Sequence, residues 1–300
     1  MTASTPELTL DATVKRALQA FSEAGVPRPA VLFLMATGAE PLVERLRGSA
    51  EHALDGLVSL PAPWNAAVLH AGRLGAVQAW LFDDLSLEPR DARAPGWWSG
   101  LPLWLAAAAG ASVCVHVSAG TALGEDGSRL APGSLALLRD HLNLSGSNPL
   151  AGLGPSALGP LFPDTSLLHH AGLRVAALER AERLGLAAHE AVGACIGGPA
   201  LETPAERRML ARLGADVAVQ GLAEPLLAAA HAGLRVLSVV AVLDAGPSRP
   251  SVGAAGALDV ARLVEQALEV QPDLLRLVSA LADDLARAVA ALDEAEDVDA

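Results

Sequence analysis

Short apolar runs alternate with helical segments along most of this chain, and this alternation limits the possible folds more than any other feature. The runs have the length of strands, and the segments between them have the spacing of helices. Such an order predicts an α/β layer fold with a largely parallel central sheet. We expect strands at 31–35, 66–69, 76–82, 113–117, 134–138, 191–196, 217–220 and 236–243, and helices at 10–23, 101–109, 173–184, 204–213 and 223–231.

No internal repeat and no linker divides the 300 residues, so we expect a single domain over 1–300. Residues 1–26 form its N-terminal helical part. Residues 247–256 are rich in Pro, Gly and Ser and predict a loop before C-terminal helices. The last helix turns acidic at Asp283, and we expect 283–300 to fray from Glu294 into a solvated acidic tail.

Composition excludes several classes of protein. The net charge is −13, Lys15 is the single lysine and tyrosine is absent, which argues against nucleic acid as a partner. The apolar runs are too short to cross a bilayer, so no membrane is expected. Residues 1–9 carry no export signal, which predicts a cytoplasmic location. Cys114 and Cys195 lie in apolar runs and favour buried free thiols over a disulfide or a zinc site.

The segment 196–208 places one carboxylate, Glu202, directly before a helix. Thr203, Pro204 and Glu206 have the spacing of a helix N-terminus with a capping box, so the helix should begin at Pro204. Glu202 then lies in a strand-to-helix loop, where α/β proteins place ligand-binding groups. A carboxylate there can accept two hydrogen bonds from a planar N–H edge such as that of a purine. The alternative is that Glu202 only interacts with the helix dipole.

The same segment resembles the trimeric purine nucleoside phosphorylase family, whose base-binding loop reads Gly-Pro-x-x-Glu-Thr-x-Ala-Glu-x-Arg before a helix and Leu-Gly-Ala-Asp. The resemblance extends over about residues 27–244, because further segments follow in the family's order. They are Arg28-Pro29-x-Val31, His70-Ala71-Gly72-Arg73-Leu74, Ser118-Ala119-Gly120, Pro132-Gly133-Ser134, Arg139-Asp140-His141-x-Asn143-Leu144-x-Gly146, Asn148-Pro149-Leu150, Phe162-Pro163 and His231-x-Gly233-Leu234-Arg235-Val236.

The resemblance implies a fold and a reaction. The fold is a single α/β domain with a mixed central sheet that curls toward a barrel and is flanked by helices, assembled as a homotrimer. The reaction is phosphorolysis of a purine nucleoside to the free base and ribose 1-phosphate, through a transition state like an oxocarbenium ion. Inorganic phosphate is the co-substrate, and no cofactor or metal is expected.

The resemblance also implies roles for two carboxylates. Glu202 would hold the N1–H side of the purine. Asp244 stands where the family usually has asparagine, as in relatives that act on 6-aminopurines; it would accept from the 6-amino group or, when protonated, donate to N7. Two carboxylates around one base would repel each other and raise the pKa of one of them. Alternatively, Asp244 only begins a turn.

Other expected contacts follow from the same alignment. Thr37 would contact phosphate, and the backbone of Ala119 and Gly120 would line the nucleoside pocket. Other positions differ from the family. Gln220 replaces a ribose-contacting methionine, Gly221 replaces a serine, and Leu201 and Leu158 replace phenylalanines.

The phosphate side departs furthest from the family. Leu81 stands at its arginine, Asp83 at its histidine, and a second histidine falls near Ala257. Each lost charge-assisted hydrogen bond is worth about 1.5–3 kcal/mol, so phosphorolysis by the family's own residues should be impaired. The loop 86–100 could compensate with the cations Arg90 and Arg93 and with aromatic cover, or be a surface loop whose tryptophans pack on the body. The tryptophans are Trp97 and Trp98.

Three functions therefore remain open: an altered phosphorylase, a non-catalytic protein that binds a purine or nucleoside, and a hydrolase in which water replaces phosphate. The substituted phosphate ligands favour the last two, and the Glu202 loop favours a retained base site. The histidines add no further chemistry. We expect His169 and His170 on different faces of a helix, where they cannot form a metal pair, and His116 as an interior histidine.

Overall fold

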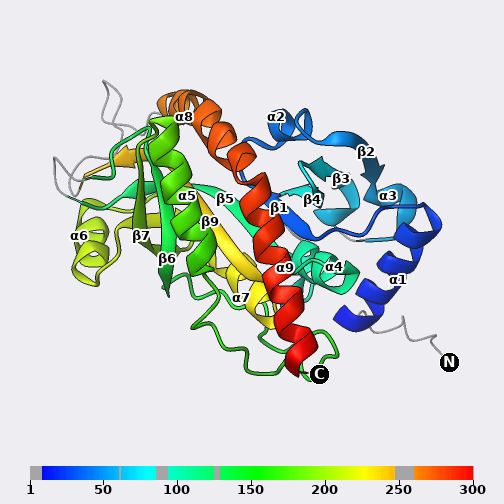
Figure 1. The fold of residues 1–300 in the computed structure, drawn as a ribbon. Coiled ribbons are helices and arrows are strands. Elements are labelled where there is room, and N and C mark those ends of the chain that lie inside the picture. The colour runs from blue at the N-terminus through cyan, green and yellow to red at the C-terminus, as the bar shows by residue number, and fades with distance from the viewer. Residues whose placement is uncertain (1–8, 61, 86–93, 125–128, 247–259, 300) are drawn as a thin grey trace.

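The computed structural model describes residues 9–60, 62–85, 94–124, 129–246 and 260–299. These residues form one nine-stranded sheet in the order β2-β3-β4-β1-β5-β8-β7-β6-β9, with helices on both faces (Figure 1). A further pairing of β9 with β5 closes β5, β8, β7, β6 and β9 into a barrel, as the resemblance implied. The strands are β1 (Val31–Met35), β2 (Arg47–Ala53), β3 (Val68–Leu74), β4 (Val77–Asp83), β5 (Val113–Ala122), β6 (Leu135–Asn143), β7 (Ala188–Ile196), β8 (Val217–Gln220) and β9 (Arg235–Ala245).

Two apolar cores lie on the two faces of this sheet. Side chains of α1, α4 and α7 pack into one core, and side chains of α5, α8 and α9 pack into the other. Helices α8 and α9 follow one another diagonally across the molecule in Figure 1. The helices are α1 (Leu10–Glu23), α2 (Ala39–Val43), α3 (Leu54–Leu57), α4 (Leu101–Ala109), α5 (Ala171–Leu184), α6 (Pro204–Arg212), α7 (Ala223–His231), α8 (Val260–Ala280) and α9 (Ala282–Asp299), with short 3-10 helices at Trp64–Ala66 and Gly96–Gly100. None of these helices is long and apolar enough to cross a membrane.

The sheet is mixed rather than largely parallel. Strand β1 is parallel to β4 and β5, β5 is parallel to β9, and β7 is parallel to β6 and β8. The pairs β2–β3, β3–β4, β5–β8 and β6–β9 are antiparallel. The alternation of apolar runs and helices therefore predicted the layers correctly, but it overestimated the parallel part. For one of these pairs the cause is local: β3 and β4 are joined by a tight turn, which only antiparallel neighbours allow.

Among the differences from the sequence-based expectation, two concern the edge of the sheet and the C-terminal helix. Strand β2 was not predicted, because its side chains are mostly exposed and it lies at the edge of the sheet without an apolar pattern. The expected fraying from Glu294 is wrong for the backbone, since α9 continues to Asp299. Its first part is also not solvated: Leu285 is fully buried, and Asp284 pairs with Arg180.

The carboxyl ends of the parallel strands β1, β4, β5 and β9 lie on the same side of the sheet, and β8, which runs antiparallel to β5, ends beside Gly120. Met35 at the end of β1 pairs with Val117, and beyond this point β5 continues beside β9, where Thr121 pairs with Asp244. Strand β7 ends beside β8, where Ile196 pairs with Gln220. Ligands of α/β sheets bind beyond such carboxyl ends, and the predicted site residues follow or end these strands.

Candidate functional site

The loop between β7 and α6 has the conformation that the sequence predicts. The Thr203 hydroxyl accepts from the Glu206 backbone N–H at 3.3 Å, and the Glu206 carboxylate accepts from the Thr203 backbone N–H at 2.7 Å. This capping box begins α6 at Pro204. On the other side of the loop, the Gln220 amide donates to the Ala200 carbonyl at 3.0 Å. The two contacts fix the backbone on both sides of Glu202.

The sequence analysis did not anticipate the residue that links the two predicted carboxylates. Arg207 lies on α6 and is fully buried. Its Nη2 is 2.9 Å from Asp244 Oδ2, its Nε is 3.5 Å from Glu202 Oε2, and its Nη1 donates to the Gly246 carbonyl at 3.3 Å. The signal was the i, i+3 spacing of Arg207 and Leu210, which places an arginine on the buried face of the helix.

Glu202 and Asp244 are 7% and 8% exposed, so both carboxylates are almost removed from water. Burial raises the pKa of Glu202; the hydrogen bond from its own backbone and the charge of Arg207 oppose the rise, and Asp244 and Glu206 add to it. The predicted increase for one of the two carboxyls is therefore confirmed, but its main cause is desolvation rather than mutual repulsion. Repulsion is limited because Arg207 contacts both carboxylates.

The last residues of β5 are packed closely against β8. A Cβ on Gly120 would lie 2.6 Å from the Ala218 carbonyl oxygen, so only glycine allows β8 to approach β5 here. Ala119 and Gly120 are partly exposed, whereas the preceding Ser118 is 3% exposed and its Oγ has no hydrogen-bond partner among the described residues. The backbone at Ala119 and Gly120 is thus accessible beside the end of β9.

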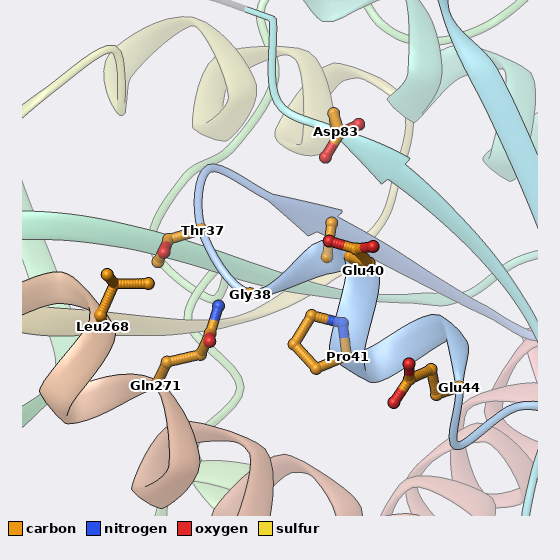
Figure 2. A pocket seen from close by; sticks show the side chains of 9 residues that line it. Thr37, Gly38, Glu40, Pro41, Glu44, Asp83, Leu268 and Gln271 are labelled. Carbon is orange, nitrogen blue, oxygen red and sulfur yellow. The ribbon is translucent and has the colours of Figure 1, made fainter. Parts of the chain in front are cut away.

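A cavity of about 570 Å³ opens beside Thr37. Figure 2 shows Thr37 on the loop after β1, Glu40 on α2, Glu44 directly after α2, Asp83 at the end of β4 and Gln271 on α8. Among the described lining residues there is no Lys, Arg or His. The remaining lining residues are Gly38, Ala39, Pro41 and Leu268.

The two positions of the lost phosphate ligands have different surroundings. Leu81 is fully buried in an apolar core and does not line the cavity. Asp83 does line it; partial burial raises the pKa of Asp83, and His70 opposes the rise. The cavity in which Thr37 would contact phosphate is therefore lined by carboxylates.

The remaining predicted contact residues lie on the same edge. Gln220 ends β8 and contacts the loop at Ala200 and Gly198, and Gly221 follows in the left-handed conformation at φ 71°. Leu201 is partly buried beside Glu202. Leu158 instead packs against the apolar core that contains α1, α4 and α7.

The tryptophans of the loop 86–100 pack on the body of the protein. Trp97 and Trp98 are 5% and 0% exposed, and the Trp98 indole donates to the Ala62 carbonyl at 3.0 Å. They are therefore not available as cover over the site. Arg90 and Arg93 lie outside the described residues, as does Ala257.

The histidines differ in part from expectation. His169 and His170 precede α5 rather than lying in it: His170 is the N-cap residue, and its Nδ1 accepts from the Leu173 backbone N–H at 3.1 Å. His169 contacts His141 at 3.0 Å, and burial lowers the pKa of His169 to about 4. His116 is interior as expected, with Nε2 2.9 Å from Asp84. Within the described part of the chain, no group of three or more His, Cys, Asp or Glu could hold a metal ion.

Comparisons with known proteins identify the family and the fold. The sequence matches the family model of the phosphorylase superfamily over residues 101–283. Purine nucleoside phosphorylase 1 of Geobacillus stearothermophilus is 36% identical over 160 residues, which are 52% of this chain and 56% of that protein. The purine nucleoside phosphorylase of Mycobacterium tuberculosis is 34% identical over 214 residues, 69% of each chain. A crystal structure of schistosoma purine nucleoside phosphorylase in complex with hypoxanthine superposes with a TM-score of 0.76 at 21% identity, covering 92% of this chain and 99% of that chain.

The chain therefore belongs to the phosphorylase superfamily, and within it to the purine nucleoside phosphorylase family. The match to the Geobacillus protein spans little more than half of that protein's length. The structural likeness, at its low sequence identity, establishes the fold.

Proposed function

We propose that this protein binds a purine base or nucleoside at the carboxyl edge of the barrel and cleaves the nucleoside by phosphorolysis to base and ribose 1-phosphate. The observation that carries the proposal is the buried pair Glu202 and Asp244, two acceptors joined by one guanidinium at the ends of adjoining elements. An edge of N–H donors is the natural complement of such a pair. The names of the relatives support the same substrate class.

In this proposal, each residue of the site has a stated role. Glu202 serves the N1 side of the purine and Asp244 serves N7 or the 6-substituent. The backbone of Ala119 and Gly120 lines the nucleoside, and Thr37 contacts phosphate, the co-substrate. Leu201, Gln220 and Gly221 complete the lining of the nucleoside pocket, and no cofactor or metal takes part.

We further propose that phosphorolysis is slow at low phosphate. Glu40, Glu44 and Asp83 surround the cavity beside Thr37, and a phosphate dianion placed there would be repelled. The same observation favours a second candidate, a purine-binding protein that does not catalyse phosphorolysis. It also favours a hydrolase, since neutral water is not repelled by carboxylates.

Assembly and location belong to the proposal as well. Leu161, Phe162 and Leu167 are 54%, 89% and 65% exposed and lie within seven residues of each other in the chain. Exposed apolar side chains gathered in this way are typical of a protein interface, and they support a homotrimer like that of the family. A role in purine salvage in the cytoplasm is the corresponding cellular function.

One assay separates these possibilities. Purified protein is incubated with inosine, guanosine and adenosine, with and without phosphate, and base release is followed. Release that needs phosphate supports the phosphorylase, and release that does not need it supports the hydrolase. Binding of a nucleoside without release supports the non-catalytic protein, and absence of both binding and release contradicts the proposal.

A further inference from the structure

Three histidines meet where β6, the start of α5 and the start of β9 come together. His141 lies on β6, and His169 and His170 directly precede α5. The His170 backbone N–H donates to the Val236 carbonyl at 2.9 Å, and the Val236 N–H donates to the Leu168 carbonyl at 2.8 Å. This short piece of chain therefore lies against the first residues of β9. We call His141, His169 and His170 the histidine cluster.

One contact of the cluster needs an unprotonated nitrogen. His170 is the N-cap residue of α5, and its Nδ1 accepts from the Leu173 backbone N–H at 3.1 Å. An imidazolium has N–H donors on both nitrogens and no acceptor. Protonation of Nδ1 would therefore remove the cap. It would also place a positive charge at the N-terminus of a helix, where the helix dipole disfavours it.

A second contact limits protonation in the same way. His141 Nδ1 lies 3.0 Å from His169 Nε2, and the two rings meet edge to face. In such a pair one nitrogen donates and the other accepts, whichever ring holds the hydrogen. If both rings were charged, two N–H groups would point at each other. The pair therefore keeps this hydrogen bond only while at least one of its rings is neutral.

Basic groups from three elements surround the cluster. His116 of β5 and Arg174 of α5 face His169, and Arg174 and Arg235 of β9 face His170. His169 is 9% exposed, and its Nδ1 has no hydrogen-bond partner among the described residues. A charge on His169 would therefore be withdrawn from water and would face further cations.

Carboxylates offset this charge only in part. Asp140 of β6 faces the pair of His141 and His169 and favours their protonation. Glu190 of β7 pairs with Arg174 at 2.8 Å. One of the two carboxylates therefore neutralises an arginine, and the other opposes the effect of burial on the histidines.

We propose that the histidine cluster is a pH switch, which holds the chain before α5 against β9 while its rings are neutral and releases it when they take up protons. The titration of the cluster agrees with the geometry. Burial lowers the pKa of His141 and of His170, and it lowers the pKa of His169 to about 4. The inference does not depend on the proposed purine chemistry.

The direction of the pH dependence follows from these shifts. In an opened chain, a histidine takes up its proton at about pH 6.5. In the closed cluster, His169 takes it up only at about pH 4. Between these values the opened form binds more protons than the closed form, so acid favours opening. The cluster therefore has its full stability above about pH 6.5 and loses it as the pH falls toward about 4.

Hydrogen exchange of the full chain tests the switch. Exchange is followed by mass spectrometry at about pH 7 and about pH 5 and is expressed as protection factors, which removes the intrinsic effect of pH on the exchange of an amide. The peptide to follow covers residues 168–174, whose amides donate to β9 and to the His170 ring. Residues 217–220 in β8 serve as the reference within the same molecule.

The test variant combines His169→Gln with His170→Asn. Glutamine can still form a hydrogen bond with His141, and asparagine caps a helix, but neither takes up a proton in this range. The matched control is His189→Gln, which removes a histidine of β7 outside the cluster.

We expect wild-type protection over 168–174, relative to 217–220, to fall by about tenfold or more from pH 7 to pH 5, because opening takes up at least one proton. His189→Gln should keep this fall, and the double variant should lose most of it. Relative protection that does not depend on pH in the wild-type protein, or an equal fall in the double variant, would overturn the proposal.

A second measurement uses the wild-type protein alone, so that it stands even if the double variant is already open at neutral pH. Imidazole ¹⁵N NMR reports whether each ring nitrogen carries a hydrogen. At pH 7 we expect His170 to have its hydrogen on Nε2 and none on Nδ1. At pH 5 the folded protein should keep His169 neutral, although an ordinary histidine is then mostly charged. A hydrogen on His170 Nδ1 at pH 7, or a charged His169 in the folded protein at pH 5, would contradict the switch.

Discussion

The base side and the phosphate side of the proposed site both carry carboxylates. The carboxylates of the base side are buried and paired with an arginine, and those of the phosphate side line an open cavity. On the base side, Glu202 and Asp244 are less than a tenth exposed and share the buried Arg207. On the phosphate side, the exposed Glu40 and Glu44 line an open cavity with Asp83, and no cation lines it among the described residues. The base side is a buried cluster of paired charges, and the phosphate side is a solvated acidic surface.

This difference explains how the phosphate side can change in sequence while the base side does not. A carboxylate that is buried must be paired, so a change at Asp244 or Glu202 is felt by Arg207 and by the fold. A carboxylate that water solvates needs no partner, so acidic residues at the cavity have little effect on stability. The phosphate side can thus lose its anion-binding character while the base side remains intact.

The largest effect should come from Glu202→Ala on the base side. We expect affinity for the best-binding purine to fall by about 1.5–3 kcal/mol, the value of a hydrogen bond to a charged group. Unfolding stability should also fall, because the change takes one carboxylate away from the buried guanidinium of Arg207. Calorimetry and thermal unfolding measure the two quantities, and Glu182→Ala on the exposed face of α5 is the control. Unchanged purine affinity would show that Glu202 does not bind the purine. The contrast between the base side and the phosphate side would then no longer hold.

Asp244→Asn should have the next largest effect. The amide oxygen can still accept from Arg207, but the carboxamide now also offers a donor to the base. We expect the preference for adenine over hypoxanthine to fall by about tenfold, or about 1.4 kcal/mol, since a mismatched donor or acceptor is replaced by a matched one. A competition titration with both bases measures this. The same ranking and the same ratio for both proteins would exclude Asp244 from selectivity.

The fold was predictable wherever local signals determined an element. The bounds of β1, β8, α1, α4 and α7 agree with the sequence-based prediction. Each is either an apolar run between turn residues or a helix with a recognisable beginning and end. Closure of the barrel by the β5–β9 pairing came only from the family resemblance, because pairing of distant strands leaves no local pattern.

The site was predictable for residues that lie in a motif and not for those that act through packing. Glu202 and its capping box were found from spacing, and the capping box is confirmed. The contact of Arg207 with β9 joins segments far apart in sequence, so the spacing of Arg207 and Leu210 could place the arginine on the buried face of the helix but could not identify Asp244 as its partner. Likewise, the core position of Leu81 separates it from Asp83 only once β4 packs against α2 and α9.

Thr37→Val tests whether the phosphate side of the site still contacts phosphate. If the Thr37 hydroxyl donates to phosphate, its loss should raise the half-saturating phosphate concentration by a factor that corresponds to about 1 kcal/mol, as for a neutral hydrogen bond. The half-saturating nucleoside concentration should not change. Initial rates across both concentrations measure the two values, and Thr165→Val on an exposed loop is the control. Equal changes in both values would place Thr37 outside a phosphate subsite.

Asp83→Asn should have the smallest effect, and it acts in the opposite direction. The wild-type protein should approach saturation only at high millimolar phosphate, because Asp83, Glu40 and Glu44 repel a dianion in the cavity. Removing the Asp83 charge, which is the one partly withdrawn from water, should tighten phosphate by about 0.5–1 kcal/mol, the usual value of a screened charge interaction. Adding salt should reduce the difference between wild type and variant, since ions screen the repulsion.

Initial rates at increasing phosphate, with Glu182→Gln as the charge-matched control, measure this effect. Saturation of the wild-type protein at micromolar phosphate, with no response to Asp83→Asn, would break the contrast between the two halves. Phosphate would then be held by groups outside the described residues, of which Arg90 and Arg93 are the cations closest in sequence to Asp83. Arg90→Ala and Arg93→Ala would in that case weaken phosphate strongly, whereas our proposal requires them to leave its affinity nearly unchanged.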